Sequence, residues 1–234
     1  MANLETLSIV IPVYNEVKTI AILLDKIRAV QLPNTAKEII IVDDGSSDGT
    51  REFLKTLTDC HVIVQEKNQG KGAALRRGFQ EATGTWVLVQ DADLEYDPED
   101  YQVLLAEARE KKAQVVCGSR LRGRAWKDVK VSTMGFLLGG IFLTVLTNIL
   151  YRTRLTDEPT CYKLFRRDLL MGIPLKCNRF EFCPEVTAKV ARQHIPIYEV
   201  PIRYYPRSEA EGKKIKFRDG WEAIVTLLKY RFFK

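Results

Sequence analysis

The chain has 234 residues, of which 46% are hydrophobic and 28% are charged, a composition that excludes disordered and fibrous proteins. This length allows one large domain or two small ones. The net charge of +6 is uneven, because residues 120–130 and 203–234 together carry +9. Two basic segments indicate an anionic partner such as phosphate, nucleic acid or a membrane surface.

The first half of the chain alternates between strand and helix patterns. Continuous apolar runs at 7–13, 38–42, 61–65, 86–90 and 115–117 predict buried parallel strands. Helical patterns follow the first three runs, at 20–30, 48–57 and 71–82, and Asp97 with Pro98 predicts a helix start after the fourth. The sequence therefore predicts an α/β fold with a mostly parallel sheet.

The second half has a different pattern but no linker before it. A long apolar segment at 134–151 precedes an irregular stretch containing Pro159 and Pro174, a predicted helix at 184–192 and a predicted strand at 197–204. We therefore expect a single domain, 1–234, with an elaborated second half.

Cysteines, histidines and the N-terminus bear on the cellular compartment. The five cysteines form no CxxC pair, and with only two histidines they argue against a zinc site. Their odd number fits a reducing compartment better than a disulfide framework. The N-terminus lacks the basic start of a signal peptide, so we expect a cytoplasmic location.

Polar residues follow each of the first four predicted strands. Ligands in open α/β sheets bind at the carboxyl ends of strands, so these residues are site candidates, although polar turns explain any one of them alone. The four stretches are Pro12-Val13-Tyr14-Asn15-Glu16, Asp43 to Thr50, Asn68 to Gly72, and Asp91-Ala92-Asp93.

The two aspartates after the fourth strand form the sharpest pair. Asp91 and Asp93 project to the same face, where their carboxylates can share one divalent cation. Hard oxygen ligands suit Mg²⁺ or Mn²⁺, which commonly bridge a protein carboxylate and a diphosphate. Glu95 is either a third ligand or a solvated charge.

Two common nucleotide-binding motifs are absent. A P-loop requires a hydroxyl residue after GK, but Gly72 follows Lys71. A dinucleotide fingerprint requires three glycines, and Leu75 occupies the third position after Gly70 and Gly72.

The four stretches, in this order and spacing, resemble the successive motifs of family 2 glycosyltransferases. Further stretches resemble the dolichol- or polyprenyl-phosphate mannose and glucose synthases of that family, so that the match covers about residues 7–216. They are Asp97-Pro98, Gly118-Ser119-Arg120, Phe180-Glu181 and Val200-Pro201-Ile202.

The resemblance implies a GT-A fold and an inverting hexosyltransferase, with mannose favoured over glucose. Residues 1–118 would form the nucleotide-sugar half and 119–234 the acceptor and membrane-facing half. It further implies a catalytic set (Asp91, Asp93, Arg120), a Mg²⁺ or Mn²⁺ site (Asp91, Asp93, Glu95), donor contacts (Pro12, Tyr14, Glu16, Asp43, Asp44, Lys71, Asp91, Ala92, Asp93) and acceptor-phosphate contacts (Arg120, Arg207, Lys213, Lys214).

Two departures from the family pattern matter. Cys161 stands where the acceptor-side motif usually has glycine, and no QxxRW motif occurs, which argues against processive polysaccharide synthases. A phosphate acceptor is ionised at neutral pH and needs no general base. Asp157 and Glu181 are therefore either additional acids or bases, or structural carboxylates.

The apolar segment at 134–151 has two faces and basic flanks at Lys127, Lys130, Arg152 and Arg154. A helix of this kind suits the membrane interface, although a buried core helix and a marginal spanning helix are alternatives. We expect a peripheral protein on the cytoplasmic face of a membrane, with a polyprenyl phosphate acceptor and a possible separate membrane subunit.

Three alternative functions share parts of this pattern. A family 2 enzyme with a non-lipid acceptor shares all the motifs above. A sugar nucleotidyltransferase would need a glycine-rich triphosphate loop after the first strand, which is absent here. A nucleic-acid-binding module is disfavoured because the acidic strand ends would repel that partner, so no nucleic acid is expected.

Overall fold

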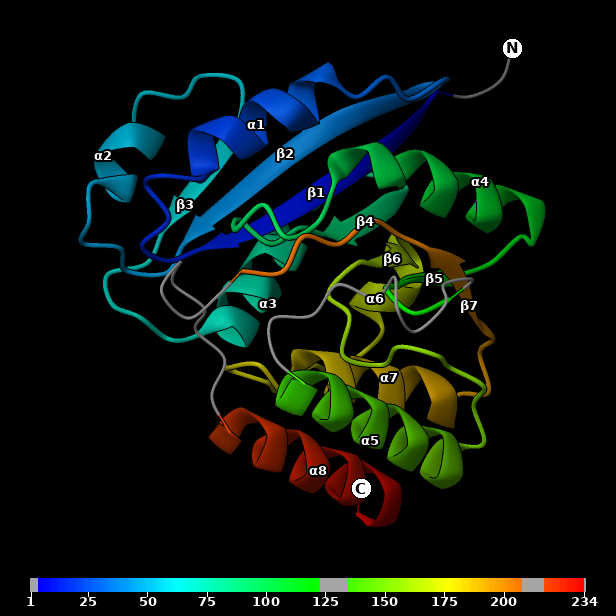
Figure 1. Ribbon diagram of the computed structural model, residues 1–234. Coiled ribbons are helices and arrows are strands. Elements are labelled where there is room, and N and C mark those ends of the chain that lie inside the picture. Colours follow the sequence, from blue (N-terminus) through cyan, green and yellow to red (C-terminus); the bar gives the residue numbers. More distant parts are fainter. Residues whose placement is uncertain (1–3, 123–133, 208–216, 234) are drawn as a thin grey trace.

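The computed structural model describes residues 4–122, 134–207 and 217–233, which form one seven-stranded sheet covered by helices (Figure 1). The strands are β1 (Glu5–Val13), β2 (Thr35–Asp43), β3 (His61–Val64), β4 (Trp86–Val89), β5 (Val115–Ser119), β6 (Lys163–Arg166) and β7 (Ile197–Pro201). Their order in the sheet is β3-β2-β1-β4-β6-β5-β7. Only β6 runs antiparallel, against both β4 and β5, so the mostly parallel α/β sheet is confirmed.

The helices form two inner layers and one outer layer. Helices α1 (Ile20–Ala29) and α4 (Tyr101–Glu110) cover one face of the sheet, and α3 (Lys71–Glu81) and α7 (Phe182–Arg192) cover the other (Figure 1). Helices α5 (Met134–Tyr151) and α8 (Phe217–Phe232) lie outside α7 (Figure 1). The short helices are α2 (Thr50–Leu54), α6 (Arg167–Met171) and the 3₁₀ turn Pro98–Asp100.

The alternation of side chains along β1 builds a separate core on each face of the sheet. Leu7, Ile9 and Ile11 pack with α1 and α4, whereas Val10 packs on the α3 side. Each of these side chains is fully buried, which contributes about 1.5–3 kcal/mol apiece. A Cβ atom at Gly78 would overlap Cγ1 of Val10, so α3 packs directly on β1.

Most of the predicted elements are present, with differences in the second half. The predicted helix start is correct, because Oδ1 of Asp97 accepts a hydrogen bond of 3.2 Å from the N–H of Glu99. Strand β7 ends at Pro201, earlier than predicted, and Tyr204 beyond it forms only an isolated bridge with Tyr96. Strand β6 and helix α8 were not predicted at all.

Helix α5 is the one helix among the described residues that is long and apolar enough to cross a membrane, and only 11% of it is buried. Its polar face points inward: Thr144 and Thr147 are buried, and the hydroxyl of Tyr151 donates a 2.6 Å hydrogen bond to the Leu227 carbonyl of α8. The structure thus places α5 outside the core. The proposed basic flanks Lys127 and Lys130 lie outside the described residues.

Candidate active site

A cavity of about 1080 Å³ opens where β1, β2 and β4 end. It extends from these strand ends to α5 and α8, and it gathers residues from both halves of the chain. Most of the predicted site residues line it: Pro12, Tyr14, Glu16, Asp44, Lys71, Asp91, Ala92, Asp93, Glu95, Arg120 and Arg207.

The two aspartates at the end of β2 organise loops. Asp43 does not line the cavity; its buried carboxylate accepts hydrogen bonds from the Ser46 N–H (3.0 Å) and from Nε of Arg51 (2.7 Å). Asp44 accepts the N–H groups of Gln69 and Gly70 at 2.7 and 2.8 Å. Burial raises the pKa of Asp44, and the two N–H donors act in the opposite direction.

The start of α3 is closed to phosphate. The N–H groups of Gly72 and Ala73 each donate a 3.0 Å hydrogen bond, to the carbonyls of Arg179 and Asn178 respectively. Gly70 has φ +98°, and a Cβ atom there would overlap the Asn178 carbonyl oxygen, so only glycine fits this loop. These two N–H groups are therefore already occupied and cannot bind a phosphate as in a P-loop, whereas the side chain of Lys71 lines the cavity.

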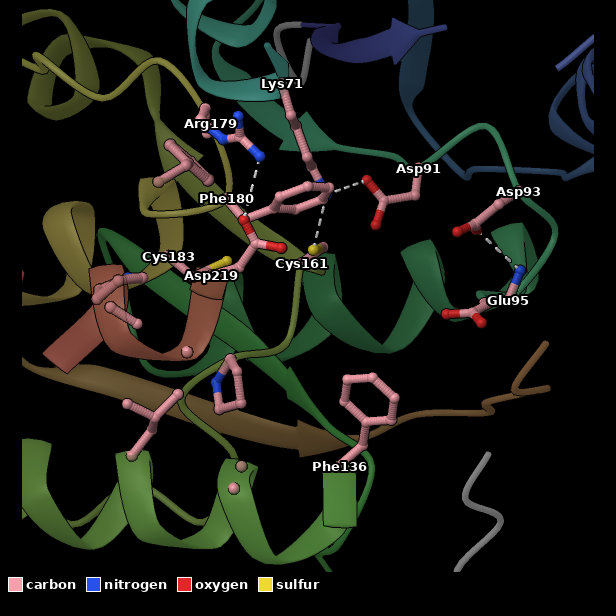
Figure 2. A pocket seen from close by; sticks show the side chains of 18 of the residues that line it. Lys71, Asp91, Asp93, Glu95, Phe136, Cys161, Arg179, Phe180, Cys183 and Asp219 are labelled. Atoms are coloured by element: carbon pink, nitrogen blue, oxygen red, sulfur yellow. Dashed lines mark hydrogen bonds and ion pairs between the residues drawn. The ribbon is translucent and has the colours of Figure 1, made fainter. Parts of the chain in front are cut away.

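Lys71 links the end of β4 to the loop before β6. Its Nζ atom lies 2.5 Å from Oδ1 of Asp91 and 2.9 Å from Sγ of Cys161, as Figure 2 shows. Burial acts to lower the pKa of Lys71, but the charge of Asp91 raises it well above its usual value. Lys71 is therefore a fixed positive charge, and Cys161, at the usual glycine position, contacts it directly.

Carboxylates are crowded around Asp93. Burial and the negative charges of Asp91 and Glu95 raise the pKa of Asp93 to about 7, although Arg207 acts to lower it. Such crowding favours a divalent cation, and two carboxylates completed by diphosphate oxygens and water are a common Mg²⁺ arrangement. Within the described ranges, no group of three His, Cys, Asp or Glu side chains forms a ready metal site. Asp91 and Asp93 therefore fit part of a divalent-cation site, which water or diphosphate oxygens would complete.

Glu95 and Arg207 have different contacts from those predicted. Both oxygens of Glu95 already accept hydrogen bonds, from the Arg207 N–H at 2.7 Å and the Tyr204 hydroxyl at 2.9 Å. The Arg207 guanidinium lies 3.2 Å from carboxylate oxygens of both Glu16 and Asp93. Arg207 thus contacts two carboxylates that were predicted to bind the donor, whereas Lys213 and Lys214 lie outside the described residues.

Arg120 enters the cavity from the end of β5. Two of its nitrogen atoms lie 2.7 Å from the two oxygens of Asp157, and its guanidinium lies 5.0 Å from the centre of the Tyr204 ring. Burial acts to lower the pKa of Arg120, but Asp157 raises it well above its usual value. Glu181 similarly accepts the N–H groups of Asn178 and Arg179, at 2.8 and 2.9 Å. Both carboxylates hold neighbouring groups in place.

Sequence reasoning missed one cation and most of the apolar wall. Arg179 lines the cavity and lies 3.5 Å from Asp219 of α8 (Figure 2). Its position directly before the Phe180-Glu181 motif was the available sequence signal. No sequence pattern indicated that α8 would pack against α5. The apolar wall includes Phe136, Leu143, Phe180, Phe182, Trp221 and Ile224.

Residues 8–173 match the protein-family profile described as Glycosyl transferase family 2. The chain belongs to this family. Asp44, Asp91 and Asp93 line the cavity at the strand ends where the resemblance predicts that the sugar-nucleotide donor binds.

Three curated proteins are similar in sequence to this glycosyltransferase. It is 28% identical over 226 residues to the low-salt glycan biosynthesis hexosyltransferase Agl6 of Haloferax volcanii, covering 95% of this chain and 53% of that protein. It is 29% identical over 243 residues to the dolichyl-phosphate beta-glucosyltransferase ALG5A of Trichomonas vaginalis (97% and 73%). It is 31% identical over 220 residues to the undecaprenyl-phosphate 4-deoxy-4-formamido-L-arabinose transferase of Proteus mirabilis (90% and 63%). The chain thus spans about half to three quarters of these proteins.

A solved structure shows the same fold. Glucosyl-3-phosphoglycerate synthase from Mycobacterium tuberculosis, crystallised with Mn²⁺, uridine diphosphate and phosphoglyceric acid, superimposes with a TM-score of 0.73. The match covers 98% of this chain and 80% of that one, at 20% identity. The likeness confirms the predicted GT-A fold.

Proposed function

We propose that this glycosyltransferase moves a hexose from a nucleotide-diphospho-sugar to a polyprenyl phosphate at a membrane surface, inverting the anomeric centre. One observation carries the proposal: the same cavity has Lys71, Asp91 and Asp93 on one side and the apolar wall of α5 and α8 on another (Figure 2). A sugar nucleotide needs the first environment and a polyprenyl chain needs the second. The two relatives named for dolichyl and undecaprenyl phosphate support this acceptor class.

The donor side is suited to a leaving diphosphate. Asp91 and Asp93 would hold a divalent cation, which when bound supplies positive charge to the departing oxygens. Lys71 adds a second positive charge beside Asp91. Pro12, Tyr14 and Glu16 line the same end of the cavity and would contact the nucleoside.

The acceptor side needs cations and no base. A phosphate monoester has a second pKa near 6, so its oxygen is already a nucleophile at neutral pH. Arg120, held by Asp157, would orient this phosphate, and Arg179 is a further guanidinium that lines the cavity. Catalysis then consists of in-line positioning and electrostatic stabilisation, and a single displacement inverts the anomeric carbon.

The hexose is proposed more broadly than the sequence resemblance implied. That resemblance favoured mannose, whereas the Trichomonas relative is named as a glucosyltransferase. Selectivity between the two sugars depends on contacts with single hydroxyl groups. We therefore propose a hexose donor and test both sugars.

The surface of α5 and α8 supports placement on a membrane. Leu138, Phe142 and Ile149 of α5 point to solvent, with Ile149 71% exposed. Helix α8 packs beside α5 (Figure 1). It exposes Trp221, 66%, and Phe232, 67%. An apolar surface shared by two neighbouring helices is typical of an interaction site. We infer that it lies in the membrane interface, next to the acceptor's lipid chain.

The test is a transfer assay on the purified chain. Radiolabelled UDP-glucose or GDP-mannose is incubated with polyprenyl phosphate in liposomes and Mn²⁺, and label in the organic phase is counted. We expect organic-phase label with one donor, none with the matched polyprenol that lacks phosphate, and none with a chelator. Transfer by the chain alone would show that no separate membrane subunit is required.

The alternatives give different products. Label that reaches only water-soluble acceptors would indicate a family member with a non-lipid acceptor. Release of inorganic diphosphate from a nucleoside triphosphate and a hexose 1-phosphate, without release of nucleoside diphosphate from the nucleotide sugars, would indicate a nucleotidyltransferase. Either result would overturn the proposed function.

A further inference from the structure

Segment 204–207 is bound to segment 93–96 at the donor end of the cavity. The Tyr205 N–H donates a 2.8 Å hydrogen bond to the Glu95 carbonyl, and the Glu95 carboxylate accepts the Arg207 N–H and the Tyr204 hydroxyl. These bonds hold the backbone of Arg207 beside the end of β4. They leave its side chain to reach across to Glu16, at the end of β1.

The side-chain contacts of Arg207 are looser than those of Arg120. Its terminal nitrogens lie 3.2 Å from oxygens of Glu16 and Asp93, whereas the Arg120 pair with Asp157 closes at 2.7 Å. Charge-assisted hydrogen bonds are strongest at about 2.7–2.9 Å. The Nε atom of Arg207 is buried and has no hydrogen-bond partner among the described residues. The guanidinium of Arg207 thus lies between two carboxylates but forms only long hydrogen bonds with them.

A divalent cation bound to Asp93 would lie close to the guanidinium of Arg207. Oδ2 of Asp93 is the oxygen that Arg207 contacts, and its other oxygen, Oδ1, accepts the Glu95 N–H at 3.1 Å. A cation bound at about 2.1 Å from that carboxylate would lie within a few ångströms of the guanidinium and repel it.

We propose that Arg207 is an exchangeable counter-ion: a divalent cation that binds Asp93 displaces its guanidinium, which then serves the acceptor phosphate. The second step rests on the proposed function. The exchange makes donor binding favour acceptor binding, because the same arginine neutralises carboxylates in the empty site and phosphate in the filled one. Arg207 would then contact the acceptor phosphate, as the sequence resemblance implies, only after the metal has bound.

The first experiment follows the arginine directly. In protein labelled with ¹⁵N at arginine Nε, the Arg207 signal is assigned by its loss in Arg207→Gln. Mg²⁺ alone should expose the buried Arg207 N–H to water and broaden its signal. The Arg120 signal, held by Asp157, serves as the internal control and should persist. An unchanged Arg207 signal at saturating Mg²⁺ would overturn the exchange.

The second experiment measures affinity. Calorimetry should show Mn²⁺ binding about tenfold tighter in Arg207→Gln, because no guanidinium has to be displaced. The matched control is Arg203→Gln, since Arg203 directly precedes segment 204–207 but pairs with Asp100 at 2.9 Å and Asp97 at 3.5 Å. Equal or weaker Mn²⁺ binding in Arg207→Gln, with thermal unfolding showing a folded protein, would contradict the proposal.

The third experiment tests the link to phosphate. A short-chain polyprenyl phosphate in detergent should bind the wild type about tenfold more tightly with Mg²⁺ and uridine diphosphate than without them, and Arg207→Gln should lose this gain. The Mg²⁺ and Mn²⁺ readouts need neither donor nor acceptor. If Arg207 moves but no hexose reaches polyprenyl phosphate, the exchange holds and the proposed function fails. If transfer is active while Arg207 stays in place, the proposed function holds and the exchange fails.

Discussion

Arg120 and Asp157 form a bidentate ion pair, with two nitrogen–oxygen distances of 2.7 Å. The Arg120 N–H adds a third bond to the same carboxylate, at 2.8 Å. Asp157 is only 3% exposed, so the ion pair with Arg120 lies largely out of contact with water on the carboxylate side. The pair fixes the plane of a guanidinium that lines the cavity.

This pair predicts a large effect from removing one partner. Asp157→Asn should lower the free energy of unfolding by up to about 3–5 kcal/mol, since the half-buried Arg120, whose side chain is 22% exposed, would lose its counter-charge. Arg120→Met with Asp157→Leu should recover much of that stability in urea unfolding but not transfer. Full activity in the double variant would show that Arg120 does not contact the acceptor.

The raised pKa of Asp93 predicts how metal-free stability depends on pH. Its pKa rises from 3.8 to about 7, so the folded state holds the proton more tightly than the unfolded state. The free energy of unfolding therefore falls as pH rises through this window. Asp93→Asn should lack this loss and, with chelator present, exceed wild-type stability at pH 8 by on the order of 2 kcal/mol, while abolishing transfer. Parallel urea-unfolding profiles at pH 5 and 8 would contradict this.

The same proton competes with the metal. Mn²⁺ requires an ionised carboxylate, so its affinity should weaken by about tenfold for each pH unit below 7. Calorimetry at about pH 5.5, 6.5 and 7.5 measures the Mn²⁺ affinity on both sides of the Asp93 pKa of about 7. A pH-independent affinity would exclude Asp93 as a ligand.

Two glycines should respond oppositely to alanine. Gly78→Ala should destabilise the protein by about 1–3 kcal/mol, because the new methyl group overlaps Val10. At Gly139 of α5 no atom lies within 4 Å of an added Cβ, so Gly139→Ala should be neutral or stabilise by up to about 1 kcal/mol. Similar unfolding midpoints for both variants would argue against close packing of α3 on β1.

Membrane binding should depend on the exposed face of α5. Phe142→Asp with Ile149→Asp should reduce liposome flotation several-fold, and salt should reduce wild-type flotation on anionic lipid. Val103→Asp is the matched control, because Val103 is exposed on α4, on the other side of the sheet (Figure 1). Loss of flotation in the control as well would indicate a non-specific effect of charge.

The reach of the sequence can be judged from particular elements. Strands β1 to β4 were predictable because their apolar runs are continuous, as in residues 7–13. Strand β6 was missed because Leu164 and Phe165 stand between Lys163 and Arg166, too short an apolar run to identify. Asp91 and Asp93 were predicted to lie with the other strand ends, because strand ends converge in any parallel sheet, and both line the cavity.

The contacts of charged residues were harder to predict than their location. Arg207 belongs to a basic segment, which indicates an anionic neighbour but cannot distinguish a ligand's phosphate from Glu16 and Asp93. Which carboxylate lies nearby depends on how segment 204–207 packs, through bonds to Glu95 that no local pattern encodes. Glu95 illustrates the same limit, because its oxygens are taken by the backbone and by Tyr204.

The direction of β6 determines which loops lie at the cavity. Its parallel neighbours β4 and β5 finish at the cavity, whereas β6, running the other way, starts there. The stretch that precedes β6 therefore arrives at the same rim as the stretches that follow β4 and β5, bringing Asp157 to Arg120 and Cys161 to Lys71. Had this strand run with its neighbours, those two residues would lie at the opposite edge of the sheet. One reversed strand thus allows the enzyme to assemble its rim from chain that enters the sheet as well as chain that leaves it.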